Sequence, residues 1–478
     1  MTFALWHPSQ GRDRRSSIVN ELVLPHDGDR LVHGNAEVMP QYVERALAEA
    51  LARGAGVALM HAHPLGSGWQ GMSSDDRDTE ASLGPSAFGA TGLPLLGMTM
   101  AGDETVAARL WVRSGPRRYQ RRECESVRVI GQRLQVFFEP RLRPAPTAGR
   151  TQVRSVAAWG PTAQAMFARL RVGVVGAGNV GSIVAEILAR TGIGDIRLID
   201  FDSLEVLNLD RTLGATRLDV LLARSKVETA ARAVRRSAVS RSQRVEAIEF
   251  SVAESDGFRA ALDCDVLFSC VDRPWPRAVL NLMAYAHAIP VIDGGILVRT
   301  IKGERMRGAE WVAQVAAPTR RCLECVGQYD PGLVSAEREG YFDRPSYIAG
   351  LPEDHPIKRN ENVFIFGVAD ASLEALQFLS LAVAPGGISN VGAQTYTAAA
   401  GCLSSDYSPC LSTCLYSGPD ILGRGDHSGL VVTGRHETAE QTRETRRREQ
   451  RRLPKRILRS GAGIGDRIIE LLERRVAN

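Results

Sequence analysis

The chain has 478 residues and a mass of 51.9 kDa, which is enough for two or three domains. Its composition, 44% hydrophobic and 24% charged, is typical of globular proteins, and a net charge of +5 is too small to predict nucleic-acid binding. The sequence lacks a run of 18 apolar residues, and its first residues lack the basic and apolar regions of a signal peptide. We therefore expect a cytoplasmic protein without a membrane-spanning helix.

The basic residues are almost all arginine. Lysine and arginine total 59, but lysine occurs at four positions: Lys226, Lys302, Lys358 and Lys455. Genomic base composition explains most of such a bias, yet a lysine that is kept in this chain is a stronger candidate for a chemical role.

Residues 1–145 are predicted to form a first domain. A strand is expected over residues 17–25, a helix over 41–51 and a buried strand over 56–60. Pro140, Pro144 and Pro146 then indicate a linker.

Residues 146–434 are predicted to form a second domain of the α/β class. Its apolar strands, separated by helical stretches, indicate a mainly parallel sheet with helices on both faces; they are expected over residues 171–175, 196–200, 265–271 and 289–293. Added strands, a long crossing loop and a helix near 371–382 follow. We interpret the Arg-rich tail, 435–478, as a solvated helix or flexible arm, with helical periodicity near 468–472 and without the interleaved aromatics of nucleic-acid binding.

A candidate metal site follows the strand at 56–60. His61 and His63, two residues apart, leave a strand on the same side, and nitrogen ligands with a carboxylate suit zinc. A bare H-x-H is most often a surface turn. The longer string H-x-H-P followed by S-x-x-D, however, resembles the JAMM (MPN) metalloproteases, which include deubiquitinating isopeptidases. The resemblance implies that His61, His63 and Asp76 bind catalytic zinc and that Ser73 stabilises the oxyanion.

This string departs from the JAMM pattern in two ways. The gap before the serine is longer than usual, so Ser74 and Asp75 are alternatives for the register. The family also uses a glutamate as general acid/base, expected here near Thr2, whereas the nearest carboxylate on a strand is Glu21. Three interpretations stay open: an inactive peptidase, recruitment of Glu21, or a chain truncated at its N-terminus.

A candidate nucleotide site opens the second domain. Gly176, Gly178 and Gly181 form G-x-G-x-x-G between a strand and a helix, which permits a tight turn and close approach of phosphate. Asp200 closes the next strand, where an acid can bind ribose hydroxyls. NAD-dependent oxidoreductases share both features.

The residues after Asp200 favour a different nucleotide. Asp202, Asn208 and Arg211 complete a D-x-D and N-L-x-R pattern that resembles the ThiF/MoeB/HesA superfamily, which includes the ubiquitin-activating enzymes. The resemblance implies a Rossmann-like domain that uses ATP and Mg²⁺ to adenylate the C-terminal glycine of a ubiquitin-like protein. It also implies that Lys226 contacts phosphates and that Asp272 holds magnesium. Further positions that fit the pattern are Arg277, Gly294 and Gly295, and, more loosely, Arg150 or Arg154 as an arginine that reaches a partner subunit; Thr212 departs from it.

Four of the eight cysteines form two pairs. Cys322 with Cys325 and Cys410 with Cys414 would make a tetrahedral structural zinc site, as the superfamily commonly has; two free thiol pairs are the alternative. Between Cys325 and Cys402 there is no cysteine, so a thioester step is either absent or uses Cys402 from an unusual position. Cys264 and Cys270 are expected to be packing residues.

These patterns together predict a JAMM-type domain fused to a ThiF-like adenylyltransferase. One half would activate a ubiquitin-like protein and the other would trim or remove it, in a homodimer, with a conjugating enzyme as a further partner. The alternatives are activation of a sulfur-carrier protein and an N-terminal domain that only docks the substrate. An NAD-dependent dehydrogenase is the weakest interpretation.

Overall fold

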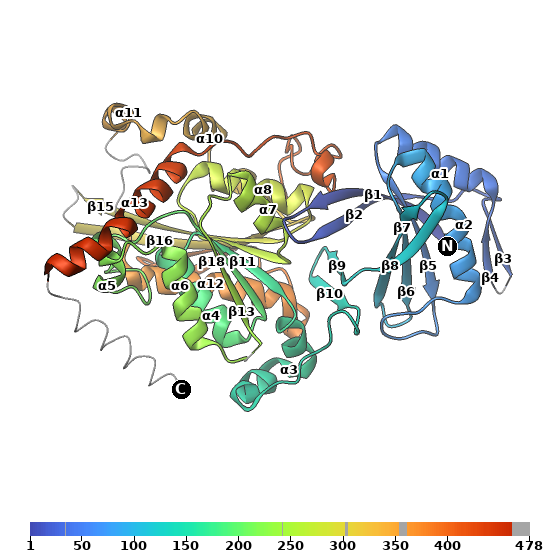
Figure 1. Ribbon diagram of the computed structural model, residues 1–478, viewed down its shortest axis with the longest axis horizontal. Coiled ribbons are helices and arrows are strands. Elements are labelled where there is room, and N and C mark those ends of the chain that lie inside the picture. Colours follow the sequence, from blue (N-terminus) through green and yellow to red (C-terminus); the bar gives the residue numbers. More distant parts are fainter. Residues whose placement is uncertain (34, 241, 302–304, 353–360, 461–478) are drawn as a thin grey trace.

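The computed structural model describes the chain except residues 34, 241, 302–304, 353–360 and 461–478. Lys302, Lys358 and the periodic segment 468–472 therefore lie outside the described residues. Two sheets form the two halves of the molecule, which are joined by a hairpin and by the linker (Figure 1).

The N-terminal half is a six-stranded sheet with two helices. The strand order is β2-β1-β5-β6-β7-β8, with bounds β1 Thr2–Gln10, β2 Arg15–Val23, β5 Gly56–His63, β6 Leu95–Ala101, β7 Val106–Gly115 and β8 Arg118–Glu123. Helices α1 (Pro40–Ala52) and α2 (Ser74–Thr91) pack on one face, where Phe3, Tyr42 and Leu59 are buried together. A small hairpin, β3 (Arg30–His33) and β4 (Asn35–Val38), precedes α1. The predicted helix and strand in this half are confirmed.

A two-stranded sheet precedes the linker. It consists of β9 (Ser126–Ile130) and β10 (Leu134–Phe138), and Leu134 and Phe138 are buried in the core of the C-terminal half. No helix or strand covers residues 139–149, and η1 (Arg150–Gln152) and α3 (Val153–Phe167) follow.

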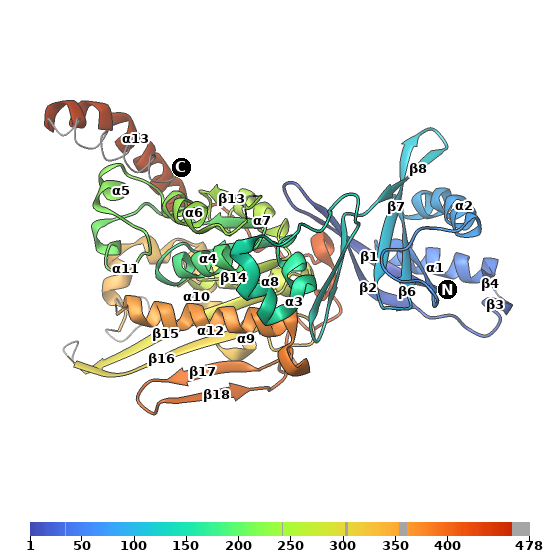
Figure 2. The same cartoon turned by 90° about the horizontal axis from the view of Figure 1, so that it is seen from below.

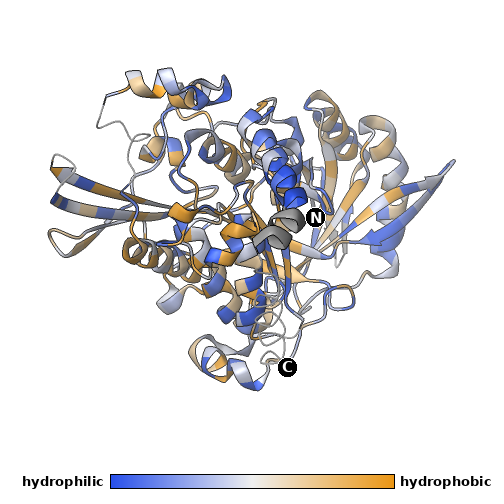
Figure 3. Cartoon of the chain, turned by 60° about the vertical axis from the view of Figure 1, so that its left-hand side comes forward, coloured by the Kyte–Doolittle hydropathy of each residue, from blue (hydrophilic) through white to orange (hydrophobic). Residues whose placement is uncertain are grey.

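The C-terminal half is an eight-stranded mixed sheet in the order β13-β12-β11-β14-β15-β16-β17-β18. In this order the first five strands, from β13 through β11 to β15, run parallel to one another. Strands β16, β17 and β18 extend the sheet with antiparallel pairing. The strand bounds are β11 Arg171–Val175, β12 Asp195–Ile199, β13 Arg244–Ile248, β14 Val266–Ser269, β15 Val291–Ile301, β16 Arg305–Ala316, β17 Ala393–Thr397 and β18 Cys402–Asp406. The predicted parallel α/β sheet is confirmed, and hydrophobic residues gather in the interior of the molecule (Figure 3).

Helices cover both faces of this sheet, so that two separate cores form. One core contains side chains from α4 (Asn179–Thr191), α6 (Lys226–Ser237) and α12 (Phe364–Val383). The other contains side chains from α7 (Ser255–Leu262) and α8 (Pro274–Ala286). The remaining short elements are η2 Val206–Asn208, α5 Arg217–Leu221, α9 Leu323–Val326, α10 Pro331–Arg338, η3 Tyr341–Asp343, α11 Pro345–Gly350, η5 Pro385–Gly387 and η6 Gly425–His427.

Helix α12 is long and apolar enough, by length and composition alone, to cross a membrane. In the structure it packs along α4 and strands β15 and β16 (Figure 2). It buries Asp370, Glu374 and Gln377 toward the sheet. These contacts are those of a core helix, and the predicted helix at 371–382 is its C-terminal part.

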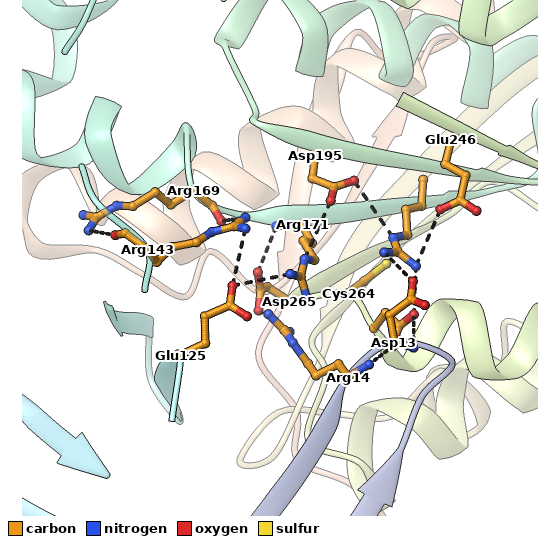
Figure 4. A network of polar contacts seen from close by, with 12 residues as sticks. Asp13, Arg14, Glu125, Arg143, Arg169, Arg171, Asp195, Glu246, Cys264 and Asp265 are labelled. Carbon is orange, nitrogen blue, oxygen red and sulfur yellow. Dashed lines mark hydrogen bonds and ion pairs between the residues drawn. The ribbon is translucent and has the colours of Figure 1, made fainter. Parts of the chain in front are cut away.

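The β1–β2 hairpin connects the two halves. Its tip, with Asp13 and Arg14, reaches the amino-terminal edge of the parallel strands (Figure 4). The Gly11 backbone lies against Asp263 there. Arg14 donates to Asp265 at 2.7 Å, and Arg197 donates to Asp263 at 2.8 Å and to Asp13 at 3.2 Å. Buried charges at this interface are thus paired across the two halves.

The Arg-rich tail differs from the prediction. Helix α13 (Glu437–Ser460) lies on the C-terminal half, and its Arg443 and Arg446 are buried in ion pairs with Glu254 and Glu249. The helix of that interpretation is confirmed and most side chains at residues 437–452 are exposed, but the face that carries Arg443 and Arg446 is buried and not solvated. The sequence pattern did not predict that this helix packs on the C-terminal half. Arginines are expected to be solvent-exposed unless acidic partners are known to lie near them.

Candidate nucleotide and metal sites

The glycine loop between β11 and α4 needs its three glycines for different reasons. Gly176 has a φ of +90°, and a Cβ there would strike the Cys270 carbonyl. A Cβ on Gly181 would strike the Gly176 carbonyl, so this glycine permits the turn to close. Around Gly178, by contrast, no atom lies within 4 Å of an added Cβ. The open space at the N-terminus of α4 is where an anionic group can approach the backbone.

Two carboxylates and one ammonium lie beside this loop. Asp200 accepts hydrogen bonds from the backbone N–H of Ala177 at 2.7 Å and of Asp202 at 2.8 Å. Lys226 begins α6 and places Nζ 2.6 Å from a carboxylate oxygen of Asp202. The structure therefore brings together three residues that are spread over 27 positions (200 to 226) of the sequence.

The charges of these groups are strongly coupled. Burial, with the Asp202 charge in addition, raises the pKa of Asp200. Burial of the Lys226 ammonium opposes its charge, but the carboxylates of Asp200, Asp202 and Asp272 together raise its pKa above the usual value. Because the Lys226 ammonium stays charged among these carboxylates, it can leave a carboxylate and bind a phosphate oxygen instead. Carboxylate and phosphate are both anionic hydrogen-bond acceptors.

The residues fit a magnesium nucleotide. Asp272 is exposed on the loop after β14, at the same edge of the sheet as Asp200 and Asp202. Carboxylate oxygens are the ligands that Mg²⁺ prefers, and it keeps some of its waters. The carboxyl ends of parallel strands are also where ligands bind in open α/β sheets.

Asn208 and Arg211 are bonded locally in this structure. The Asn208 side chain accepts from the backbone N–H of Glu205 at 2.9 Å, and Arg211 donates to the Leu207 carbonyl at 2.6 Å and to Asp210. Arg277 donates to Asp293 and to the Gly294 carbonyl, so it supports the strand β15. The described contacts of these three residues do not join them to Lys226.

A group of buried acids that no sequence motif indicated lies beneath the loop. Asp293, Asp370 and Glu374 are fully buried, and burial raises the pKa of all three, that of Asp370 to about 8. Of these three acids, Asp293 accepts a hydrogen bond from the Arg277 guanidinium. Asp370 and Glu374 lie four residues apart in an otherwise apolar helix. Two acids on the same face of an apolar helical segment were the signal available in the sequence.

The second candidate site lies at the end of β5. One ring nitrogen of each histidine and one carboxylate oxygen of Asp76 lie within 4.8 Å of one another. His61 Nε2 is 3.4 Å and His63 Nε2 3.3 Å from the two Asp76 oxygens. Two nitrogens and one oxygen in this arrangement fit a zinc ion with an open fourth position.

Ser73 and Asp76 form the N-terminal cap of α2. The Ser73 hydroxyl accepts from the Asp76 N–H at 3.1 Å, and the Asp76 carboxylate accepts from the Ser73 N–H at 3.0 Å. Of the two aspartates considered for the register, Asp76 is the one that faces the histidines. Ser73 holds the cap and lies beside the cluster, while Ser74 is bonded to Asp75.

Glu21 lies away from the histidines. It pairs with Leu5 on β1, and Leu5 pairs with Val57, four residues before His61 on β5. At the strand rise this separation is about 13 Å. Recruitment of Glu21 is therefore wrong for this structure, and Thr2, which pairs with Met60, occupies the position expected for the glutamate.

A buried ion pair supports the metal cluster from below. Glu80, one turn after Asp76 on α2, binds Arg109 and Trp111. Arg109 donates to the Thr99 hydroxyl at 2.7 Å, and Thr99 lies 3.3 Å from His61 Nε2. Glu80 is engaged as a structural anchor of this network, which fixes the orientation of His61.

The four paired cysteines converge as predicted. Their sulfurs lie within 4.8 Å of one another, with Cys322 buried and 3.7 Å from Cys414. Cys410 accepts from the Cys322 N–H at 3.2 Å. Four thiolates at this spacing fit a closed structural zinc site. Cys264 and Cys270 pack in the cores, and Cys402 is exposed on β18.

The fold and the first site define a nucleotide-binding domain of the Rossmann-like α/β class, with a glycine turn, an acid after the second strand and a lysine at a helix start. The model of the ThiF family matches residues 150–399, more than half of the chain. The chain therefore belongs to the ThiF family.

The curated relatives cover the same half. Ubiquitin-like modifier-activating enzyme 5 of Drosophila willistoni is 29% identical over 178 residues, which are 35% of this chain and 40% of that protein. The tRNA threonylcarbamoyladenosine dehydratase of Escherichia coli is 34% identical over 138 residues, 29% of this chain and 50% of that protein. The chain thus spans half or less of these relatives.

Among solved structures, E. coli MccB with ATP aligns at a TM-score of 0.43 and 18% identity, covering 56% of this chain and 75% of that one. Family membership, with Lys226 and Asp272 beside the glycine loop, disfavours the dehydrogenase interpretation.

Proposed function

We propose that the C-terminal half activates the C-terminal carboxylate of a ubiquitin-like protein by adenylation with ATP. The observation that carries the proposal is the convergence of Lys226 with Asp200, Asp202 and Asp272 beside the open backbone at Gly178. The name of the Drosophila relative, a ubiquitin-like modifier-activating enzyme, supports this substrate class.

The chemistry needs positioning and charge. A carboxylate oxygen of the substrate attacks the α-phosphorus of ATP, a new O–P bond forms, and the bond to the leaving pyrophosphate breaks. Asp272 would hold magnesium, which supplies charge to the phosphates, and Asp200 would bind the ribose hydroxyls. Lys226 would leave Asp202 for a phosphate oxygen, while the N–H groups at the start of α4 face the same anion.

The test is ATP–pyrophosphate exchange with the cognate ubiquitin-like protein. Exchange should occur with the full chain and fall at least about a hundredfold in Asp272→Ala. Asp256→Ala, an exposed aspartate on α7, is the matched control and should keep wild-type exchange. Absence of exchange in the wild type, or equal exchange in Asp272→Ala, would refute the proposal.

We further propose that the N-terminal half is a JAMM-type zinc site that processes or removes the same protein. The cluster of His61, His63 and Asp76 supports zinc binding, and the anchor from Glu80 through Arg109 supports a preorganised site. With Thr2 in the position expected for the glutamate, catalysis is the weaker part of this proposal and docking of the substrate the alternative.

Two measurements separate these roles. Zinc content by elemental analysis should fall by about one ion per chain in His61→Ala. Cleavage of a fused ubiquitin-like precursor should vanish in the same variant and with chelator. Zinc binding without cleavage would favour the docking role, and chelator-resistant cleavage would refute the metalloprotease.

The segment between the two cysteine pairs favours a second candidate for the adenylate. Because no cysteine lies between Cys325 and Cys402, a sulfur donor would attack the acyl carbon of the adenylate. A C–S bond then forms, the C–O bond to AMP breaks and AMP leaves, as in sulfur-carrier activation. Sulfide-dependent thiocarboxylate on the partner, seen by mass spectrometry, would support it. We place either reaction in the cytoplasm, in a homodimer, with a conjugating enzyme as a partner only in the first case.

A further inference from the structure

Helix α13 lies across the carboxyl edge of the parallel strands, where the candidate nucleotide residues are. Arg443, Arg446 and Gln450 are spaced by three and four residues and share one face of the helix. All three donate hydrogen bonds to loops at that edge. The contacts join the C-terminal tail to the site across 189 to 245 residues of sequence.

Arg446 contacts the loop that carries the two aspartates. Its side chain is 2% exposed, and Nη1 donates to the Phe201 carbonyl at 2.9 Å and to the Ser203 hydroxyl at 3.1 Å. Phe201 stands between Asp200 and Asp202. The guanidinium therefore holds the peptide that sets the direction of both carboxylates, and Glu249 neutralises it at 2.9 Å.

Gln450 contacts the loop that delivers the lysine. Its side chain donates to the Ala223 carbonyl at 3.1 Å, at a turn where Ala223 has a φ of +49°. Lys226 follows three residues later and donates its backbone N–H to the Asp202 carbonyl at 3.0 Å. One helix face thus supports both sides of the pair between Asp202 and Lys226.

The start of α13 is fixed separately. Arg443 binds both oxygens of Glu254, at 2.6 and 2.7 Å. The ring of His436 is stacked on Trp275, with centroids 5.3 Å apart and planes at 7°, and it lies 4.9 Å from Phe201. These contacts place α13 independently of Arg446, so loss of the Arg446 side chain would leave the helix attached.

We propose that Arg446 is a positioning residue of the nucleotide site and that α13 is a working part of that site. Burying a guanidinium is unfavourable unless it is fully paired, and here its partners include the backbone of the aspartate loop. Without it, Asp200 and Asp202 would lose the fixed orientation that lets them face Lys226 and a magnesium nucleotide. This inference rests on the proposed adenylation.

The test uses the full chain with Arg446→Ala and, as matched control, Arg447→Ala, whose exposed side chain is the next residue on the helix. In ATP–pyrophosphate exchange, Arg446→Ala should raise the KM for ATP about tenfold, with a smaller change in kcat. Arg447→Ala should leave both constants unchanged, and Arg446→Lys should recover part of the loss.

The outcomes distinguish the two proposals. Wild-type exchange with an unchanged KM for ATP in Arg446→Ala would overturn this inference alone, even if the melting temperature fell, since the role would then be structural. An equal effect of Arg447→Ala would overturn it too. Lack of exchange in the wild type would overturn the adenylation and this inference with it.

A milder variant covers the case in which Arg446→Ala does not fold. Ser203→Ala removes one of the acceptors of Arg446 and keeps the ion pair with Glu249. It should raise the KM for ATP about threefold. If it leaves the KM unchanged while Arg446→Ala fails to fold, the positioning role is refuted.

Discussion

Arg14 Nη1 lies 2.7 Å from Oδ1 of Asp265, and this bond joins the N-terminal sheet to the amino edge of the nucleotide-binding sheet. Asp265 is fully buried, and although burial opposes its charge, Arg14 and Arg128 hold its pKa below the usual value. The interface between the two halves therefore depends on buried charge pairing.

Removal of Arg14 should destabilise the chain. Arg14→Ala leaves the buried carboxylate with one cationic neighbour, and we expect a loss of about 3 kcal/mol in denaturant unfolding. Arg12→Ala breaks a half-exposed pair with Glu246 and should cost less than about 1 kcal/mol. Equal losses for the two variants would show that burial does not decide the strength of this interface.

The glycine loop predicts two different phenotypes. Gly178→Ala has room in the folded chain and should keep its melting temperature, yet it should weaken ATP binding about tenfold because the methyl group fills the ligand's space. Gly181→Ala strikes the Gly176 carbonyl and should cost about 1–3 kcal/mol of stability. Binding by calorimetry and thermal melting separate the two, and a reversed pattern would contradict the assignment.

Zinc at the four cysteines should stabilise the C-terminal half. Cys322→Ala should remove one zinc ion and lower the melting temperature by at least about 5 °C. Cys402→Ala, an exposed cysteine on β18, should change neither. Unchanged stability with no zinc by elemental analysis would remove the site.

The interface also predicts a pH dependence. His287 bonds Ser9 of the N-terminal half at 2.8 Å, and burial lowers the pKa of His287 to about 4. Between pH 6.5 and 4 the unfolded chain therefore binds more protons than the folded chain. The free energy of unfolding should decrease as the pH is lowered through this window, by at most about 1.4 kcal/mol per pH unit. His287→Asn should flatten the slope in pH-resolved unfolding, whereas the exposed control His26→Asn should keep it.

The two candidate sites lie in different halves of the molecule, one after β5 and the other after β11 and β12 (Figure 1). Strand β1 runs about 30 Å from the metal cluster to the hairpin tip, and the parallel strands add about 16 Å to the nucleotide edge. Substrate should therefore leave one site before it reaches the other. An equal mixture of His61→Ala and Asp272→Ala should recover about half of the wild-type coupled activity, and no recovery would show that both sites must act within one chain.

Local sequence signals predicted much of this molecule. The parallel sheet followed from apolar strands of similar length, and the loop from Gly176 to Lys226 followed from a motif whose residues are linked by short connections. His61, His63 and Asp76 were found because a strand end and a helix cap, only 10 residues apart (63 to 73), place them together.

The tertiary structure alone decided what depends on distant partners. The tail was predicted to be solvated because Glu249 and Glu254, which form ion pairs with its buried arginines, lie nearly 200 residues away in the sequence. Glu21 was excluded by strand register, which no local pattern fixes. The sequence by itself determined the chemistry available at each site, since residue type and short-range spacing set it. Only long-range packing decided which charges are buried, which are paired, and how far apart the two sites lie.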